Sequence, residues 1–257
     1  MKMTKSLTLG ALLIGAVTAV PAFANEFTAN ASVTNNYVWR GLTQTENNPA
    51  VQGGFDWAHD SGFYIGTWVS NVSYGSQSDF DPGSNLGPNV DAFNYEHDIY
   101  AGFSGGNDNF TWDVGYLYYN YDEAAEFDFG EIYGTIGVGG FSFSANVLTN
   151  TEADDGGVLD FDFGSTYYLS ADYAFEVAGG LEIGFHVGYH DGDFSVAFNG
   201  VEDDYIDFNA YIARGGFSFM VSGTDLDEDS FATTSRLAND ELRFVVAYSV
   251  DFDLLSD

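Results

Sequence analysis

The chain has 257 residues and a formal net charge of −33, because 6 Lys and Arg stand against 39 Asp and Glu. This charge excludes nucleic-acid binding through a basic surface, since a phosphate backbone would be repelled. The absence of cysteine excludes disulfides, thiolate metal ligands and a cysteine nucleophile. A mean hydropathy of −0.09 leaves no room for several apolar helices of about 20 residues, which excludes a helical membrane protein.

Residues 1–24 have the pattern of a secretory signal peptide. Two lysines precede an apolar run, Leu7–Val20, and a small-x-small cleavage motif ends at Ala24. We therefore predict cleavage after Ala24, which leaves residues 25–257 as one exported domain. The alternative is a single membrane anchor, but the apolar run is short for a span of about 20 residues. The basic residues outside this segment are Arg40, Arg214, Arg236 and Arg243.

From residue 26 onward, apolar and polar residues alternate with a period of two, the pattern of strands with two different faces. In one stretch, Ile183, Phe185 and Val187 alternate with Gly184 and His186. Twelve strands are predicted in this way: 26–40, 50–59, 63–74, 91–104, 110–121, 131–138, 141–149, 166–177, 181–190, 204–213, 217–223 and 241–252.

Short and long connections alternate along the chain. The short ones contain Gly or Asn, which provide the positive φ that tight hairpins need, and they lie at 59–62, 105–109, 139–140, 178–180 and 214–216. The long ones are polar, several are acidic, and they lie at 41–49, 75–90, 122–130, 150–165, 191–203 and 224–240. In an antiparallel meander every second connection lies at the same end, so all short turns should lie opposite all long loops.

These features predict an all-β fold: a single antiparallel up-and-down transmembrane β-barrel of about 12 strands. Its short turns should be periplasmic and its long acidic loops should face outward, as in bacterial outer-membrane barrels. A sheet that spans a bilayer must close, because its backbone polar groups have no water to bind. The alternative is a secreted soluble β-sandwich or lipocalin-like barrel. Two polar residues, Asn35 and His97, fall on the predicted lipid face.

Three segments near the N-terminus carry a family resemblance: Asn35–Thr45, Asn48–Asp56 and His59–Val72. Together they resemble the TorF porin family, a set of proteobacterial outer-membrane barrels of unknown substrate. The resemblance implies the fold and the outer-membrane location. A barrel in that membrane is expected to contact outer-membrane lipid, lipopolysaccharide and the barrel assembly machinery. It implies no ligand and no catalytic residue. The last alternating aromatic is Phe252, which we expect to be the residue that the assembly machinery recognises, although five residues follow it.

The alternation also predicts which side chains point into the lumen. The acidic ones are Asp56, Glu96, Asp98, Asp113, Glu131, Asp172, Glu176, Glu182, Asp207 and Asp251. The aromatic ones include Tyr64, Trp68, Tyr100, Tyr119, Tyr133 and Tyr168.

Two arginines are expected inside, near the outer mouth. The first predicted strand ends at Arg40 and the last one begins near Arg243, and closure makes these two strands neighbours. The two side chains would either produce a transverse field across a constriction or neutralise nearby carboxylates such as Asp56 or Glu96.

An acidic lumen attracts cations and repels anions. The predicted function is therefore passive diffusion of small hydrophilic solutes, cationic or neutral. Barrels of 8 strands are filled by side chains and 16-stranded ones hold an aqueous channel, so about 12 strands and inward tyrosines indicate a narrow bore. The alternative is a closed structural or adhesive barrel that acts through its outer loops. A monomer is the default oligomeric state.

An enzyme is the competing class. The chain has four histidines, His59, His97, His186 and His190, and no G-x-S-x-G motif. Ser-His catalysis needs a base within hydrogen-bond reach of the nucleophile, and the predicted strands bring Ser70 next to neither His186 nor His190. Acidic loops can bind calcium, but none matches the twelve-residue calcium loop. We predict no catalytic residue, no metal site and no cofactor.

Overall fold

The computed structural model describes residues 25–74, 93–122, 126–201, 204–227 and 237–255. The predicted signal peptide (1–24), the predicted loop 75–90 and Arg236 lie outside the described residues.

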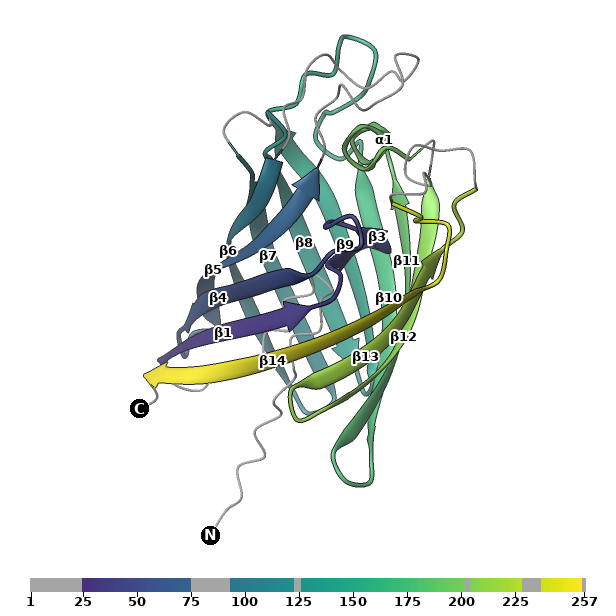
Figure 1. Ribbon diagram of the computed structural model, residues 1–257. Coiled ribbons are helices and arrows are strands. Elements are labelled where there is room, and N and C mark those ends of the chain that lie inside the picture. The colour runs from purple at the N-terminus through teal and green to yellow at the C-terminus, as the bar shows by residue number, and fades with distance from the viewer. Residues whose placement is uncertain (1–24, 75–92, 123–125, 202–203, 228–236, 256–257) are drawn as a thin grey trace.

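In the described part of the chain, 12 strands close one barrel in which chain neighbours pair antiparallel (Figure 1). The strands are β1 (Glu26–Thr34), β4 (Ala50–Ala58), β5 (Phe63–Tyr74), β6 (Phe93–Asn107), β7 (Phe110–Asn120), β8 (Phe129–Val138), β9 (Phe141–Thr151), β10 (Tyr167–Val177), β11 (Leu181–Asp191), β12 (Tyr205–Arg214), β13 (Phe217–Thr224) and β14 (Arg243–Leu255). The barrel closes where β1 pairs with both β14 and β4. The predicted fold class is confirmed.

The two faces of the wall differ as a bilayer requires. Phe185 and Val246, which point outward, are 49% and 50% exposed, whereas Glu96 and Glu131, which point inward, are 2% exposed. A secreted soluble barrel would place its apolar side chains inside and its carboxylates in water. The observed distribution is that of a barrel which crosses a membrane with its strands. No helix within the described ranges is long and apolar enough to cross a bilayer.

The short turns lie at one end of the barrel, and the described parts of the long connections lie at the other (Figure 1). One long connection contains α1 (Asp193–Asn199), a helix that the alternation pattern does not predict. The end of β14 lies beside the start of β1, at the end of the short turns. Phe252 pairs with Ala29 and points outward at 49% exposed, and the pairing shifts by one residue between Phe27 and Thr28.

The two polar residues on the lipid face have hydrogen-bond partners that explain their positions. Asn35 follows β1, and its side chain receives the backbone N–H of Val246 at 2.7 Å and donates to the carbonyl of Phe244 at 3.1 Å. The Nε2 atom of His97 lies 2.8 Å from the hydroxyl of Thr67 on the neighbouring strand. Neither residue therefore presents an unpaired polar group to lipid.

The prediction of a first strand over 26–40 is wrong at its end. β1 ends at Thr34, and residues 35–49, which we call the inward loop, turn into the barrel (Figure 1). The loop contains a small hairpin of β2 (Val38–Trp39) and β3 (Leu42–Thr43). Its turn residues, Arg40 and Gly41, have φ of 47° and 79°, and two-residue hairpin turns commonly need positive φ at both positions. This turn reverses the chain inside the lumen, so Arg40 does not lie on the barrel wall.

Candidate functional site

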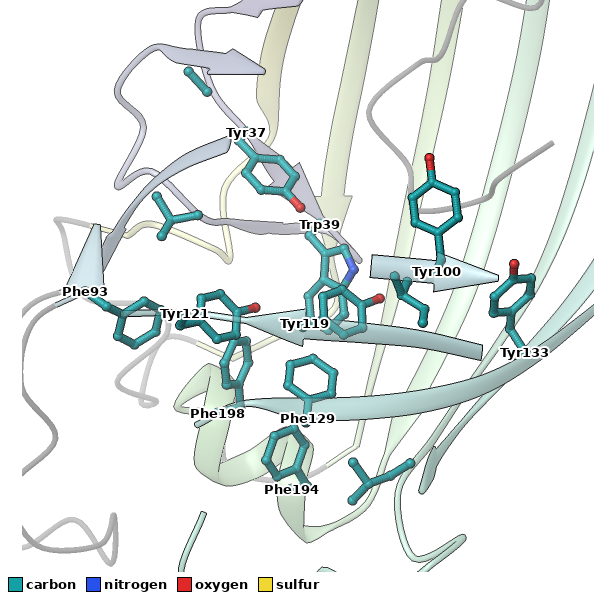
Figure 2. Packing of buried hydrophobic residues seen from close by; sticks show 14 of the residues in the cluster. Tyr37, Trp39, Phe93, Tyr100, Tyr119, Tyr121, Phe129, Tyr133, Phe194 and Phe198 are labelled. Atoms are coloured by element: carbon teal, nitrogen blue, oxygen red, sulfur yellow. The ribbon is translucent and has the colours of Figure 1, made fainter. Parts of the chain in front are cut away.

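The inward loop reaches across the lumen and contacts opposite walls. Trp39 meets Tyr119 of β7 edge to face, with 5.9 Å between ring centroids (Figure 2). On the other side Val38 packs with Met220 of β13 and Val245 of β14. Because β7 and β13 stand opposite each other in the ring of strands, the loop spans the bore at this level.

Arg40 at the tip of this hairpin is held by an ion pair. Its guanidinium donates to the two carboxylate oxygens of Glu131 on β8, at 2.9 and 2.6 Å. Its Cζ atom lies 4.2 Å from the ring centroid of Trp39 and 4.4 Å from that of Tyr168. Burial alone would lower the pKa of Arg40, but the Glu131 carboxylate raises it above its ordinary value, so the guanidinium stays charged.

Arg243 holds the same hairpin from the wall. Its Nη1 donates to the carbonyl of Gly41 at 2.9 Å, and its Nη2 donates to the carbonyl of Ala238 at 2.6 Å and to Oδ1 of Asn239 at 2.5 Å. Asp56 and Glu96 are examples of the carboxylates that these arginines were expected to neutralise, and Arg40 pairs with a different one, Glu131. Arg40 pairs with Glu131 because the loop places it at mid-lumen, and Arg243 binds backbone carbonyls of the loop and of the segment before β14.

The base of the loop is also hydrogen bonded to the wall. Burial raises the pKa of Tyr37, which lies between β1 and β2, so its phenol stays protonated. The Tyr37 hydroxyl donates to Oε1 of Glu96 on β6 at 2.8 Å. On the same wall, the hydroxyl of Tyr121 donates to the other oxygen of Glu96 at 3.0 Å.

Aromatic rings cover the loop on its outer side. Phe194 and Phe198 of α1 pack on Phe129, at centroid distances of 4.9 and 5.3 Å, and Phe198 also lies 6.2 Å from Trp39 (Figure 2). The Phe198 ring further packs against Tyr121 at 5.6 Å. The outer half of the lumen is thus filled by side chains from the wall, the inward loop and α1.

Two histidines lie on the inner wall beside Arg40. The Nδ1 atom of His186 lies 2.6 Å from Oδ1 of Asp172, and its Nε2 lies 3.1 Å from Oδ1 of Asp207. The hydroxyl of Tyr168 donates to Oδ2 of Asp207 at 2.9 Å. The second ring, His190, contacts Arg40 through Nε2 at 3.2 Å. Within the described ranges, no serine is a hydrogen-bond partner of either histidine.

The half of the lumen nearer the short turns holds tyrosine–carboxylate pairs. The hydroxyl of Tyr64 donates to Asp113 at 2.6 Å and also contacts the hydroxyl of Tyr133. The hydroxyl of Tyr100 donates to Asp56. Asp56 and Trp68 are partly buried.

The predicted lumen residues separate into two groups. Those gathered around the inward loop are Glu96, Asp98, Tyr119, Glu131, Tyr168, Asp207, Arg40 and Arg243, each under 9% exposed. Those farther toward the short turns are Asp56, Tyr64, Tyr100, Asp113, Tyr133 and Asp172. Among the described residues, no three His, Cys, Asp or Glu side chains form a group that could hold a metal ion.

Solved structures with similar backbones are barrels of low sequence identity. One, described as "Unveiling the Mechanism Behind the in-meso Crystallization of Membrane Proteins", has a TM-score of 0.50 at 7% identity, over 89% of this chain and 84% of that chain. "KdgM porin" gives 0.47 at 9% identity, over 90% and 99%. Outer membrane phospholipase A from Escherichia coli gives 0.41 at 11%, over 90% and 99%. At these identities the likeness concerns the fold alone.

A search of the curated proteins finds no match. A family model described as "Bacterial protein of unknown function (Gcw_chp)" matches residues 18–252, which include the whole inward loop. The match does not carry the TorF name, so that resemblance stays a prediction. The extent of the match shows that this chain belongs to the Gcw_chp family of bacterial proteins.

Proposed function

We propose that the chain is an outer-membrane channel for passive diffusion of small hydrophilic solutes, cationic or neutral, with the inward loop as its constriction. The observation that carries this proposal is the distribution of side chains across the wall. Apolar residues face outward along the strands, while the inner face is polar and holds the carboxylates. A closed wall of this kind gives water and ions a polar interior within a hydrocarbon surround.

Exposure along the inner face indicates a vestibule at the end of the short turns. Tyr205, Glu131 and His190, near the inward loop, are 1–2% exposed. Toward the short turns, the side chain of Asp172 is 29% exposed, and Glu176 and Asp251 are exposed. Solvent therefore enters the lumen at the proposed periplasmic end, whereas Tyr64, Asp113 and Tyr133, on the same side of the inward loop, are each 7% exposed.

The charges of this vestibule favour cations. Its inner wall carries Asp56, Asp113, Asp172, Glu182 and Asp251. Among the described residues, the arginines inside the barrel are Arg40 and Arg243, and both are engaged by the inward loop or its surroundings. His186 also lies inside, between Asp172 and Asp207. Rows of carboxylates attract cations into a pore and exclude anions.

The filled outer half supports one rival, a closed barrel that acts through its loops. Phe194 and Phe198 of α1 pack on Phe129 of the wall, on the outer side of the inward loop. The rival requires this packing to close the lumen permanently. In that case the outer loops would contact lipopolysaccharide or another surface. The channel proposal requires instead that small solutes pass beside the inward loop, or that the loop moves out of the lumen.

Conductance measurements separate the two proposals. The purified barrel is inserted into planar bilayers under a KCl gradient. Discrete current steps with a reversal potential near that of K⁺ support the cation channel. Silence both in the native chain and in a variant with a shortened inward loop would establish the closed barrel. Swelling of liposomes in sugars, amines and organic acids then ranks the neutral and cationic solutes.

A further inference from the structure

Three carboxylates lie close together in the outer half of the lumen. They differ in how far neighbouring groups balance their negative charge. Glu131 forms the ion pair with Arg40. Glu96 accepts hydrogen bonds from the hydroxyls of Tyr37 and Tyr121. The third, Asp98 of β6, interacts electrostatically with both Glu96 and Glu131, which are both acidic.

Asp98 is the uncompensated member of this group. It is 7% exposed and lies on the inward face of β6, two residues from Glu96. In the part of the chain that the structure describes, its buried Oδ1 atom has no hydrogen-bond partner. A buried carboxylate without a partner is costly, so the site is completed by a cation or by a proton.

Aromatic rings flank this carboxylate on both sides. Asp98 pairs with Trp68 of β5 and with Tyr119 of β7, so the three side chains stand side by side on the inner wall. Tyr37 of the inward loop meets Trp68 edge to face, with 5.5 Å between ring centroids. A single carboxylate flanked by aromatic side chains suits a small monovalent cation better than a divalent one. Calcium or magnesium would need several oxygen ligands, and one free carboxylate does not provide them.

We propose that Asp98 binds one small monovalent cation, an alkali ion or a primary ammonium group, between Trp68 and Tyr119. The inference rests on the proposed function in one respect: a cation that crosses the constriction stops at this carboxylate, beside the base of the inward loop. The binding itself requires only the barrel and its inner wall.

The test is the thermal unfolding temperature of the folded barrel in detergent, measured at a fixed scan rate. Potassium chloride and methylammonium chloride are compared with the chloride of the bulky cation N-methyl-D-glucamine at the same ionic strength. General screening of the acidic chain is equal in all three salts. A ligand that binds only the folded state raises Tm, so a concentration about tenfold above Kd should give about 3 °C or more.

The matched variants are Asp98→Asn and Asp60→Asn. Both remove one negative charge, but Asp60 lies at an exposed turn between β4 and β5. In potassium or methylammonium chloride, Tm should be higher than in the chloride of N-methyl-D-glucamine. This difference should be lost in Asp98→Asn and kept in Asp60→Asn. Equal Tm in the three salts for the native chain would overturn the site, and so would a rise that persists in Asp98→Asn.

Conductance distinguishes failure of this site from failure of the channel. A cation-dependent Tm in a barrel that conducts nothing leaves the site standing and rejects the channel. Conductance with cation preference but without a cation-dependent Tm rejects the site and leaves the channel. A rise with potassium alone, or with methylammonium alone, identifies which of the two cation types Asp98 accepts.

Discussion

Arg40 and Glu131 are 91 positions apart in the chain, yet their side chains meet inside the barrel through two hydrogen bonds of 2.9 and 2.6 Å. Arg40 is at the tip of the inward loop and Glu131 is on the wall. This ion pair therefore fastens the tip of the inward loop to the barrel wall. Its loss should affect both stability and the position of the loop.

Removing one partner of this pair should destabilise the folded barrel much more than removing both. Arg40→Met leaves the Glu131 carboxylate buried without its cation, and we expect a loss of about 3–5 kcal/mol in the free energy of unfolding. The double variant Arg40→Met with Glu131→Met should recover most of that loss. Chemical denaturation of the two single variants and the double variant measures the coupling. Additive losses in the double variant would show that the two side chains do not interact in the folded barrel.

Gly41 is a position where the backbone of the hairpin turn lies close against the wall. Its φ is 79°, and a Cβ atom there would lie 2.5 Å from Cβ of Asp207 and 2.8 Å from Cγ2 of Thr224. Gly41→Ala should therefore destabilise the loop by more than the about 1–3 kcal/mol of backbone strain alone. Gly139→Ala is the matched control, because Gly139 also has positive φ, 64°, but no atom within 4 Å of its Cβ.

Denaturation curves of both glycine variants give the comparison. If Gly41→Ala costs no more than Gly139→Ala, the inward loop is not seated against Asp207 and Thr224 as described. A larger loss for Gly41→Ala, accompanied by higher conductance, indicates that the loop has left its position in the lumen.

The outward face should tolerate charge at the rim of the barrel and not at its middle. Val187 lies near the centre of β11 and Phe217 is the first residue of β13, and both are outward and exposed. An arginine at mid-bilayer costs about 2–4 kcal/mol and one near the interface about 0–1 kcal/mol. Folding into lipid vesicles should therefore be weakened by Val187→Arg and nearly unchanged by Phe217→Arg. Equal, small effects at both positions would contradict a membrane-spanning wall.

The barrel was predictable because its two faces meet different solvents. Period-two alternation then marks every strand, and the predicted bounds of β5 (63–74) agree with the structure at both ends. Alternation also placed Glu96, Glu131 and Asp207 on the inner face, where they are buried. His97 was correctly placed on the lipid face, and its contact with the hydroxyl of Thr67 explains how a polar ring is tolerated there.

The inward loop could not be predicted from this pattern. Tyr37 and Trp39 continue the alternation of β1, because a segment inside a polar lumen also needs one apolar and one polar side. The signal that distinguishes the loop is Arg40-Gly41 followed by Thr43, Gln44 and Thr45, a hairpin turn and a polar run that come after the end of β1 at Thr34. The helix α1 had a signal as well, since Phe194 and Phe198 have the four-residue spacing of one helical face.

The most direct test of the account is the conductance of the native barrel and of a variant in which residues 36–45 are replaced by a short Gly-Ser linker. Both are measured in planar bilayers under the same KCl gradient. The loop contacts opposite walls, so its removal should raise the single-channel conductance severalfold while the acidic vestibule keeps the preference for K⁺. A variant that folds but conducts no more than the native chain would contradict the inward loop as the constriction of a cation channel.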